Sequence, residues 1–310
     1  GDAPIVLQKG TTIRVKGSPN RNSSADTLYV TYDGFAADVP VGKTILIDDG
    51  ELALEVKEKR RGTLVCEVLN DGTIAGKKSV NIPGVHIKLP SLTEKDRRFV
   101  EFAAKHDVDF IAHSFVRNKE DVLAIQKILD KHKSKAKIIA KIENQQGVDN
   151  LPEILDHAYG IMVARGDLGI EIPAAQIPLI QKRMIRRCIE RNKPVITATQ
   201  MLHTMIKNPR PTRAEVSDIA NAILDDTDAI MLSGETAYGE YPVEAVEAMT
   251  SIAQTIEAEK DGFNPLTIEQ TPDDVPAYLA KAAVNACIRL PAKAIVLDTI
   301  RGSTARRVAG

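Results

Sequence analysis

The sequence predicts an α/β protein with a separate β-rich section at its start, and three observations support this prediction. Short segments rich in β-branched residues, separated by Asp-Gly pairs, fill the first 84 residues. Apolar strand-like segments then alternate with helix-length polar segments, which is typical of parallel βαβ units. The length of 310 residues is enough for about two domains of ordinary size.

Residues 1–84 are expected to form a small antiparallel β-barrel or sandwich. Tight turns are predicted at the Asp-Gly pairs that begin at residues 33, 49 and 71, since this dipeptide favours the left-handed backbone of hairpin turns. A further turn at residues 81–84 ends the section. The expected strands are Thr11–Val15, Thr27–Thr31, Thr44–Ile47, Leu52–Val56 and Leu64–Val68.

Residues 85–260 carry the alternating pattern. The expected strands are Val108–Val116, Lys137–Ile142, Tyr159–Val163, Pro194–Ala198 and Ala229–Leu232. A helix over Arg97–His106 precedes them, and Ser91 and Glu94 have the spacing of a capping box for it. Later helices are expected to begin near Asn118, near Gly147, at Pro173–Ala174, near Thr212 and at Pro242.

Each of these strands ends in polar residues, so a site would draw on many strand ends. This arrangement favours a TIM-type (β/α)8 barrel over a doubly wound sheet, which gathers its site at one switch point. A complete barrel has eight strands and about 250 residues, so the five units predict a partial barrel. Residues 261–310 are expected to begin a further α/β domain, with a helix at Ala277–Arg289, a strand at Ala294–Leu297 and a helix from Ser303.

Composition excludes several classes of protein. Apolar residues make up 43% and charged residues 27%, and 41 Lys and Arg against 42 Asp and Glu leave a net charge of −1. A nucleic-acid-binding surface is therefore not expected, and no apolar run approaches the ~18 residues of a membrane helix. Cys66, Cys188 and Cys287 are odd in number and lack metal-ligand spacing, which predicts a reducing, cytoplasmic compartment.

A lysine and a carboxylate are expected to leave the same face at the end of one buried strand. Side chains alternate along a strand, so Ile139, Lys141 and Glu143 share a face. Buried charges are unfavourable unless they are paired or bound to ions, which makes this placement informative. The same parity groups Arg165 with Asp167, Thr197 with Thr199, and Ser233 with Glu235.

Glu143 and Asp167, on consecutive strand ends, suit a hard divalent cation such as Mg²⁺. Lys141 would add positive charge where negative charge develops on a phosphoryl group, and a tight turn over residues 166–169 could bind an anion through its N–H groups. Each residue also has a structural interpretation. Lys141 and Glu143 could form a structural ion pair, Asp167 could cap a helix, and Thr199, Ser233 and Glu235 could be hydrogen-bonded rim groups.

Five motifs occur in order: AKIEN (140–144), MVARGDLG (162–169), ITATQML (196–202), PRPTRAE (209–215) and MLSGETA (231–237). With GKKSVNIPG (76–84) before them, they closely resemble pyruvate kinase. The resemblance implies a glycolytic enzyme of the cytoplasm that transfers the phosphoryl group of phosphoenolpyruvate to ADP. It also implies a cap domain at 1–84, a barrel domain at 85–260, the start of a C-terminal domain at 261–310, and a homotetrameric parent.

The resemblance implies a role for each candidate residue. Lys141 would stabilise the transferring phosphoryl group, Glu143 and Asp167 would bind Mg²⁺ or Mn²⁺, and the backbone of Gly166 and Asp167 would bind the substrate carboxylate. Thr199 would lie beside the reacting methylene carbon, and Ser233 and Glu235 would lie on the route of its proton. Lys78 would approach the nucleotide phosphates of ADP or ATP. K⁺ is implied as well, through ligands mostly outside this sequence.

The resemblance further implies that this chain is an internal piece, because the family has three barrel strands before the point that matches Gly1 and a longer C-terminal domain. Two other interpretations therefore stay open. The chain alone could be an inert folding or interaction module of that enzyme. It could also belong to a different metal-dependent barrel, a lyase or aldolase that acts on an enolate.

Overall fold

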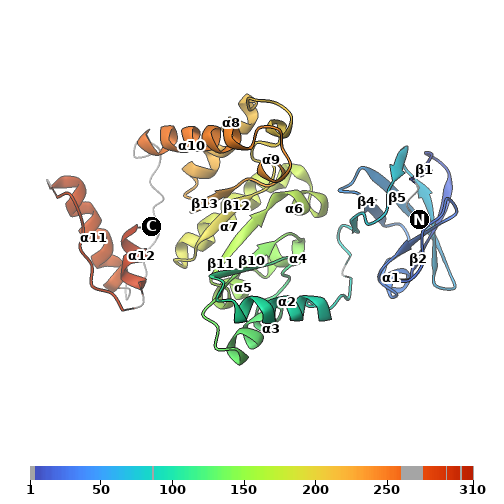
Figure 1. Cartoon of the computed structure of the whole chain (residues 1–310), viewed down its shortest axis with the longest axis horizontal. Helices are drawn as coiled ribbons and strands as arrows, with labels where there is room; N and C mark the ends of the chain where they lie inside the picture. Colours follow the sequence, from blue (N-terminus) through green and yellow to red (C-terminus); the bar gives the residue numbers. More distant parts are fainter. Residues whose placement is uncertain (1–3, 86, 260–274, 291, 301, 310) are drawn as a thin grey trace. The chain divides into compact units, whose positions relative to one another are not determined.

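A computed structural model gives the structure of residues 4–85, 87–259, 275–290, 292–300 and 302–309 (Figure 1). The chain divides into two compact units. The first contains residues 1–158 and 163–180, and the second contains residues 159–162 and 181–310.

The first section of the chain is a small β-structure, as its composition predicts. Six strands form one sheet in the order β3-β2-β6-β5-β4-β8, and β1 pairs with β7 in a second sheet. A short helix, α1 (Phe35–Asp38), lies between β3 and β4 in the sequence. The strands are β1 (Ile5–Leu7), β2 (Thr12–Gly17), β3 (Thr27–Val30), β4 (Thr44–Ile47), β5 (Leu52–Arg60), β6 (Thr63–Val68), β7 (Gly72–Ile74) and β8 (Val80–Asn81).

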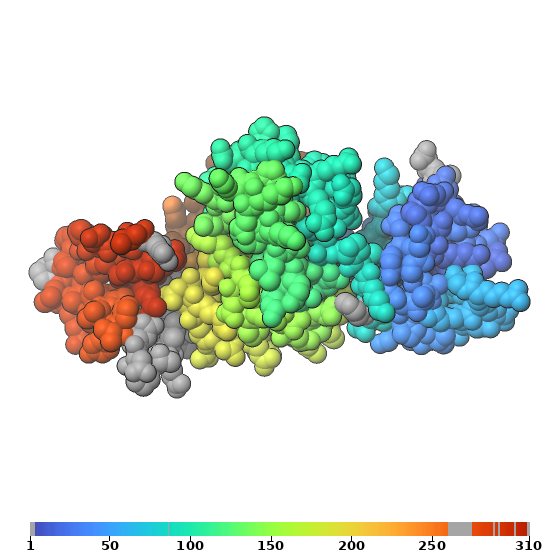
Figure 2. Space-filling model, turned by 90° about the horizontal axis from the view of Figure 1, so that it is seen from below, coloured from blue at the N-terminus to red at the C-terminus, as the bar shows by residue number. Residues whose placement is uncertain are grey.

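This sheet differs from the predicted antiparallel arrangement in one pair: β2 and β3 run parallel, with Arg14 opposite Thr27. The other pairs of the sheet are antiparallel. Its apolar side chains, among them Ile13, Leu54 and Leu64, pack into one core. Figure 2 shows the surface of this section in blue. Cys66 lies in this core, and burial raises the pKa of its thiol to about 12, so it behaves as an apolar side chain.

Helices and strands alternate through the rest of the first unit. They are α2 (Glu94–Lys105), β9 (Phe110–His113), α3 (Lys119–Lys131), β10 (Lys137–Ile142), α4 (Gln145–Asp149), α5 (Leu151–His157), the end of β11 (Gly160–Ala164), α6 (Arg165–Glu171) and a 3₁₀ turn at Ala174–Gln176. Asn118 and Asn144 cap α3 and α4 by accepting hydrogen bonds from Asp121 N and Gly147 N.

The capping box predicted for α2 was wrong by two residues. Thr93 and Asp96 form it, rather than Ser91 and Glu94. Thr93 Oγ1 accepts from Asp96 N at 3.2 Å, and Asp96 Oδ2 accepts from Thr93 N at 2.8 Å. Both pairs have the spacing of a capping box. The helix begins at Glu94, so the residue before it, Thr93, is the N-cap, and its partner three residues on is Asp96.

The second unit continues the alternation. Its elements include β12 (Val195–Ala198), a 3₁₀ turn at His203–Ile206, α8 (Arg213–Leu224), β13 (Ala229–Met231), α9 (Gly234–Ala237) and α10 (Pro242–Glu259), and α7 (Ile177–Glu190) leads into it. Thr212 caps α8 in a capping box with Glu215, and Pro242 is the first residue of α10, as predicted. Met205, Ile219 and Ala245 lie in a core shared by α8 and α10.

The strands that alternate with these helices form one sheet in the order β13-β12-β11-β10-β9. β9 and β10 pair in parallel, as do β12 and β13, and Ile161 N on β11 donates to Pro194 O at 3.0 Å. Five consecutive strands in sequential order fit part of a (β/α) barrel, because each strand lies beside the next one along the chain.

The last described residues form α11 (Val275–Arg289) and α12 (Ser303–Ala309). The strand predicted at Ala294–Leu297 was wrong, since these residues have no regular structure and Val296 is 94% exposed. A β-strand needs a neighbouring strand for its backbone hydrogen bonds, and none is assigned to this segment within the described residues. Residues 260–274, which precede the helix predicted at Ala277–Arg289, lie outside the described residues.

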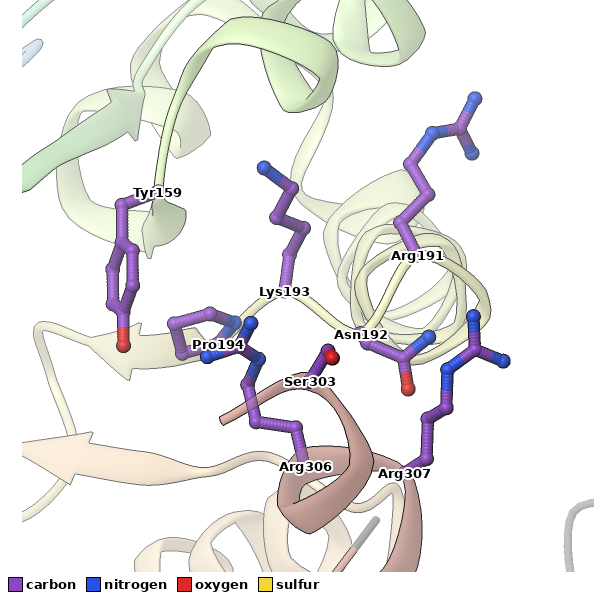
Figure 3. Close-up of a pocket in the computed structure, with 8 residues that line it drawn as sticks. All are labelled: Tyr159, Arg191, Asn192, Lys193, Pro194, Ser303, Arg306 and Arg307. Atoms are coloured by element: carbon purple, nitrogen blue, oxygen red, sulfur yellow. The ribbon is translucent and has the colours of Figure 1, made fainter. Parts of the chain in front are cut away.

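A pocket of about 230 Å³ lies within the second unit (Figure 3). Four of its lining residues are cationic: Arg191, Lys193, Arg306 and Arg307. Tyr159, Asn192, Pro194 and Ser303 complete the lining.

None of the described helices is both long enough and apolar enough to span a bilayer.

Candidate active site

A lysine and a glutamate form an ion pair at the end of β10, as the alternation of side chains predicts. Lys141 Nζ lies 2.8 Å from Glu143 Oε1. The strand is apolar on both faces, because Ile138, Ile139 and Ile142 are all buried. The Glu143 side chain is 1% exposed, and that of Lys141 is 24% exposed. A carboxylate buried to this extent requires compensation, which the ammonium of Lys141 provides.

The backbone of the neighbouring strand end also binds Glu143. Phe115, two residues beyond β9, donates its backbone N–H to Glu143 Oε2 at 2.5 Å. Its φ of 55° lies in the left-handed region, which is uncommon for an aromatic residue. Each carboxylate oxygen of Glu143 thus accepts one hydrogen bond, which leaves each with a lone pair for a cation.

Lys141 has a second partner besides Glu143. Its Nζ donates to Ser114 Oγ at 2.9 Å. An ammonium has three N–H donors, so these two interactions leave one donor for a ligand. The ammonium is therefore held in place and can still bind a phosphoryl oxygen.

Asp167 lies in the first turn of α6, and this placement corrects two predictions. Residues 166–169 were expected to form a tight anion-binding turn, but the chain becomes helical at Arg165. The strand parity that grouped Arg165 with Asp167 therefore does not apply. Burial raises the pKa of the Asp167 carboxyl, and the negative charge of Glu143 raises it further. Gly166 lies beside Asp167 in the same helical turn.

Two carboxylates that repel each other, next to a single ammonium, fit a divalent cation. The two acids and Lys141 carry a net charge of −1 when ionised, which attracts a hard divalent cation; the cation would leave the group at +1, a charge that suits a phosphate. The described residues contain no group of three or more His, Cys, Asp or Glu side chains that could hold a metal ion. Mg²⁺ is commonly bound by one or two carboxylates, with water and substrate oxygens as its other ligands, so this pair suits it.

Three further candidates, Thr199, Ser233 and Glu235, belong to the second unit, and the last two contact each other. Ser233 precedes α9 and Glu235 lies within it, so the strand parity predicted for this pair was wrong as well. Glu235 is 1% exposed and accepts from Leu202 N at 3.0 Å and from Ser233 N at 2.8 Å. This carboxylate therefore joins the chain after β12 to the chain after β13.

Thr199 directly follows β12 and has a left-handed backbone, with φ of 69°. Its Oγ1 donates to Ala198 O at 2.6 Å. Thr197, which was predicted to share its face, is buried, and its hydroxyl lies 2.9 Å from that of Thr227. The backbone leaves the extended conformation after Ala198, so the alternation of side chains along β12 does not extend to Thr199.

Lys78 lies just before β8 of the small sheet, where its Nζ forms an ion pair with Asp48 Oδ2 at 2.5 Å. Both side chains are partly exposed. The ion pair is a surface interaction of the kind that contributes little to stability, so the lysine can exchange it for another anion.

Ser114 and Phe115 were not among the predicted site residues. Parallel neighbouring strands end at the same edge of a sheet, so residues at the end of the strand predicted before β10 are the ones to examine. Ala140 lies opposite His113 in the parallel register, so the residues after His113 must lie beside Lys141 and Glu143. The left-handed backbone at Phe115 could not be found this way, because Phe rarely adopts it.

Comparison with known proteins agrees with these motifs. The family model described as "Pyruvate kinase, barrel domain" matches residues 1–246. A pyruvate kinase of Borreliella burgdorferi is 51% identical over 314 residues, covering 99% of this chain and 64% of that protein. One from Staphylococcus epidermidis is 47% identical over 317 residues, covering 99% of this chain and 53% of that protein.

A pyruvate kinase of Bacillus licheniformis is 51% identical over 288 residues, covering 91% of this chain and 49% of that protein. The chain therefore spans between about half and two thirds of the length of these relatives. Because the family model covers most of the sequence and the matching motifs include the Lys141–Glu143 pair, the chain belongs to the pyruvate kinase family.

Proposed function

We propose that this chain supplies the phosphoryl-transfer half-site of an enzyme that converts phosphoenolpyruvate and ADP to pyruvate and ATP. The observation that carries the proposal is the buried Glu143, paired with Lys141 and close enough to Asp167 to raise its pKa. A lysine that neutralises phosphoryl charge and two acids that bind a cation are the groups that phosphoryl transfer requires, because positioning and charge dominate that reaction.

In the proposed reaction, the bond between phosphorus and the enol oxygen breaks, and a bond forms between phosphorus and an oxygen of ADP. The donor that remains on Lys141 would bind a phosphoryl oxygen throughout this transfer. Glu143 and Asp167 would hold Mg²⁺ or Mn²⁺, which would supply further positive charge when bound.

The enolate that remains takes up a proton at its methylene carbon. We assign this half of the reaction to Thr199, Ser233 and Glu235, following the order of the family's motifs. Glu235 accepts hydrogen bonds from two backbone N–H groups, which supports a role in holding the loops that carry Thr199 and Ser233. The proposal also includes nucleotide binding by Lys78 and binding of the substrate carboxylate by the backbone of Gly166 and Asp167. It further includes a requirement for K⁺, a homotetrameric parent and a cytoplasmic location.

The direct test is ATP formation from phosphoenolpyruvate and ADP, followed with a coupled hexokinase assay. Turnover that requires ADP and either Mg²⁺ or Mn²⁺ supports the proposal. The assay should use both this chain and the longest natural polypeptide that contains it, because the chain spans only part of its relatives.

Two outcomes would favour the competing interpretations. If the longer polypeptide turns over substrate and the chain does not, the chain alone is an inert module of that enzyme. If phosphoenolpyruvate is consumed without any dependence on ADP, the protein is a metal-dependent lyase or aldolase rather than a kinase.

A further inference from the structure

Residues 114–117 cross the end of β10 and contact it at three successive positions; we call them the crossing segment. Ser114 Oγ accepts from Lys141 Nζ at 2.9 Å, and Phe115 N donates to Glu143 Oε2 at 2.5 Å. Val116 N then donates to Lys141 O at 3.3 Å. One short segment thus binds both charged side chains of the pair and the backbone between them.

The crossing segment is fixed at its far end by charged and amide groups. Arg117 forms an ion pair with Asp121, with Nε–Oδ2 at 3.0 Å and Nη2–Oδ1 at 3.1 Å. Asn150 Nδ2 donates to Arg117 O at 2.9 Å. A paired hydrogen bond between a guanidinium and a carboxylate is geometrically specific, so it fixes where the segment lies.

The crossing segment also contains the left-handed backbone of Phe115. A non-glycine residue keeps such a backbone only where its surroundings fix it. The φ of 55° turns the N–H toward Glu143, and the adjacent Val116 is fully buried. Gly147 of α4 lies against Val116 O, where an added Cβ would come within 2.5 Å, so helix and segment are closely fitted.

We propose that Ser114 and the backbone amide of Phe115 are positioning residues for the phosphoryl-transfer reaction proposed above. Ser114 limits the ammonium of Lys141 to one orientation in which a single N–H faces the substrate. Phe115 holds the carboxylate of Glu143 with one lone pair of each oxygen available to the cation. The inference rests on the proposed function, and neither residue touches the reacting atoms in this role.

The first experiment compares Ser114→Ala with the matched control Ser134→Ala in the natural polypeptide that contains these residues. Ser134 also loses one side-chain hydrogen bond, from Ala136 N at 3.3 Å, but it precedes the start of β10, whereas Ser114 binds Lys141 near the end of that strand. We expect kcat to fall about ten-fold or more in Ser114→Ala, as for the loss of one hydrogen bond to a charged group. The Kd for Mn²⁺ should stay within about two-fold, since Glu143 keeps both partners.

The conservative variant Ser114→Thr keeps a hydroxyl and is expected to retain at least about half of the wild-type kcat. If Ser114 had only a structural role, Ser114→Ala would lower the free energy of unfolding, and kcat and Mn²⁺ affinity would fall together. If Ser114→Ala keeps kcat within about two-fold of wild type, or if Ser134→Ala loses as much, Ser114 has no positioning role.

A second measurement does not depend on activity. The rate of reductive methylation of Lys141, followed by mass spectrometry, should rise about two-fold or more in Ser114→Ala, because the ammonium has lost an acceptor. If the wild-type protein shows no turnover, the proposed function fails. The methylation rate of Lys141 then tests by itself whether Ser114 holds the ammonium in place. An unchanged methylation rate would overturn the positioning role.

The role of Phe115 can be tested at its backbone. Incorporation of the α-hydroxy analogue of phenylalanine at this position replaces the N–H by an ester oxygen and keeps the side chain. We expect the Kd for Mn²⁺ to increase about ten-fold, because Glu143 loses a hydrogen bond to its charged form. An unchanged Kd would show that the Phe115 amide does not position Glu143.

Discussion

The ammonium of Lys141 is the charged partner of a glutamate that is 1% exposed, with 2.8 Å between Nζ and Oε1. Removal of a partner from a buried ion pair leaves a charge without compensation, and this destabilises a protein by several kcal/mol. Lys141 itself is 24% exposed, so solvent screening reduces the effect. The pair therefore contributes to the fold as well as to the proposed chemistry.

We expect Lys141→Met to abolish phosphoryl transfer and to lower the free energy of unfolding by about 2 kcal/mol. The loss of stability is expected because Glu143 is buried and would keep its charge without this partner. Urea unfolding with and without Mn²⁺ measures the effect. Lys119→Met is the control, since its ion pair with Glu153 is exposed and 3.9 Å long; equal losses in the two variants would contradict the prediction.

Glu143→Gln should weaken binding of Mg²⁺ or Mn²⁺ about ten-fold or more, with a much smaller effect on ADP affinity, because a carboxylate ligand is lost. Titration of Mn²⁺ at fixed ADP, followed by electron paramagnetic resonance, separates the two affinities. Glu153→Gln provides the same chemical change at an exposed position. Unaltered Mn²⁺ binding in Glu143→Gln would remove this residue from the proposed metal site.

Arg117→Lys should lower the free energy of unfolding by about 1–2 kcal/mol, because lysine cannot form the paired hydrogen bond to Asp121. The side chains are 19% and 6% exposed. Arg186→Lys tests the same spacing, since Arg186 and Glu190 are also four residues apart, but Arg186 is 59% exposed. Its expected loss is below about 0.5 kcal/mol. Urea midpoints measure both variants, and equal losses would show that the Arg117 geometry contributes nothing specific.

His113 should make the fold less stable in mild acid. It is buried, its Nδ1 has no partner among the described residues, and burial lowers its pKa. Asp96, Asp121 and Arg117 act on it from α2, α3 and the crossing segment, and Ser91 O lies 3.4 Å from Nε2. Below pH ~6.5 the unfolded chain therefore takes up a proton that the folded chain does not, which lowers the free energy of unfolding.

The expected loss is up to about 1.4 kcal/mol per pH unit as the pH falls from ~6.5 toward the lower pKa of the folded state. Urea unfolding of wild type and His113→Leu between pH 7.5 and 5, on the order of ten pH values, measures it. The readout is the slope of the free energy of unfolding against pH, so a constant difference in stability between the two proteins does not affect it. Parallel slopes would mean that His113 titrates alike in both states.

The sequence predicted well where one periodic pattern governs a segment. The predicted bounds of β10 match those observed, and the alternation of its side chains correctly placed Lys141 beside Glu143. The same reasoning failed where it was carried past the end of a strand. At Arg165 and at Gly234 the chain becomes helical, and a period of two no longer describes which side chains share a face.

Other features depend on contacts that a sequence does not specify. The left-handed residues Phe115 and Thr199 are fixed by their surroundings, not by their own preferences. The segment Ala294–Leu297 has the composition of a strand, but a strand also needs a neighbour.

The backbone of Thr199 has an evolutionary consequence. A β-branched residue at φ of 69° is unfavourable, and glycine there would relieve about 1 kcal/mol or more. Selection for heat resistance alone would therefore replace this threonine early, and the replacement would remove the hydroxyl that follows β12. If threonine is retained at this position under such selection, a property other than heat resistance must select for its hydroxyl.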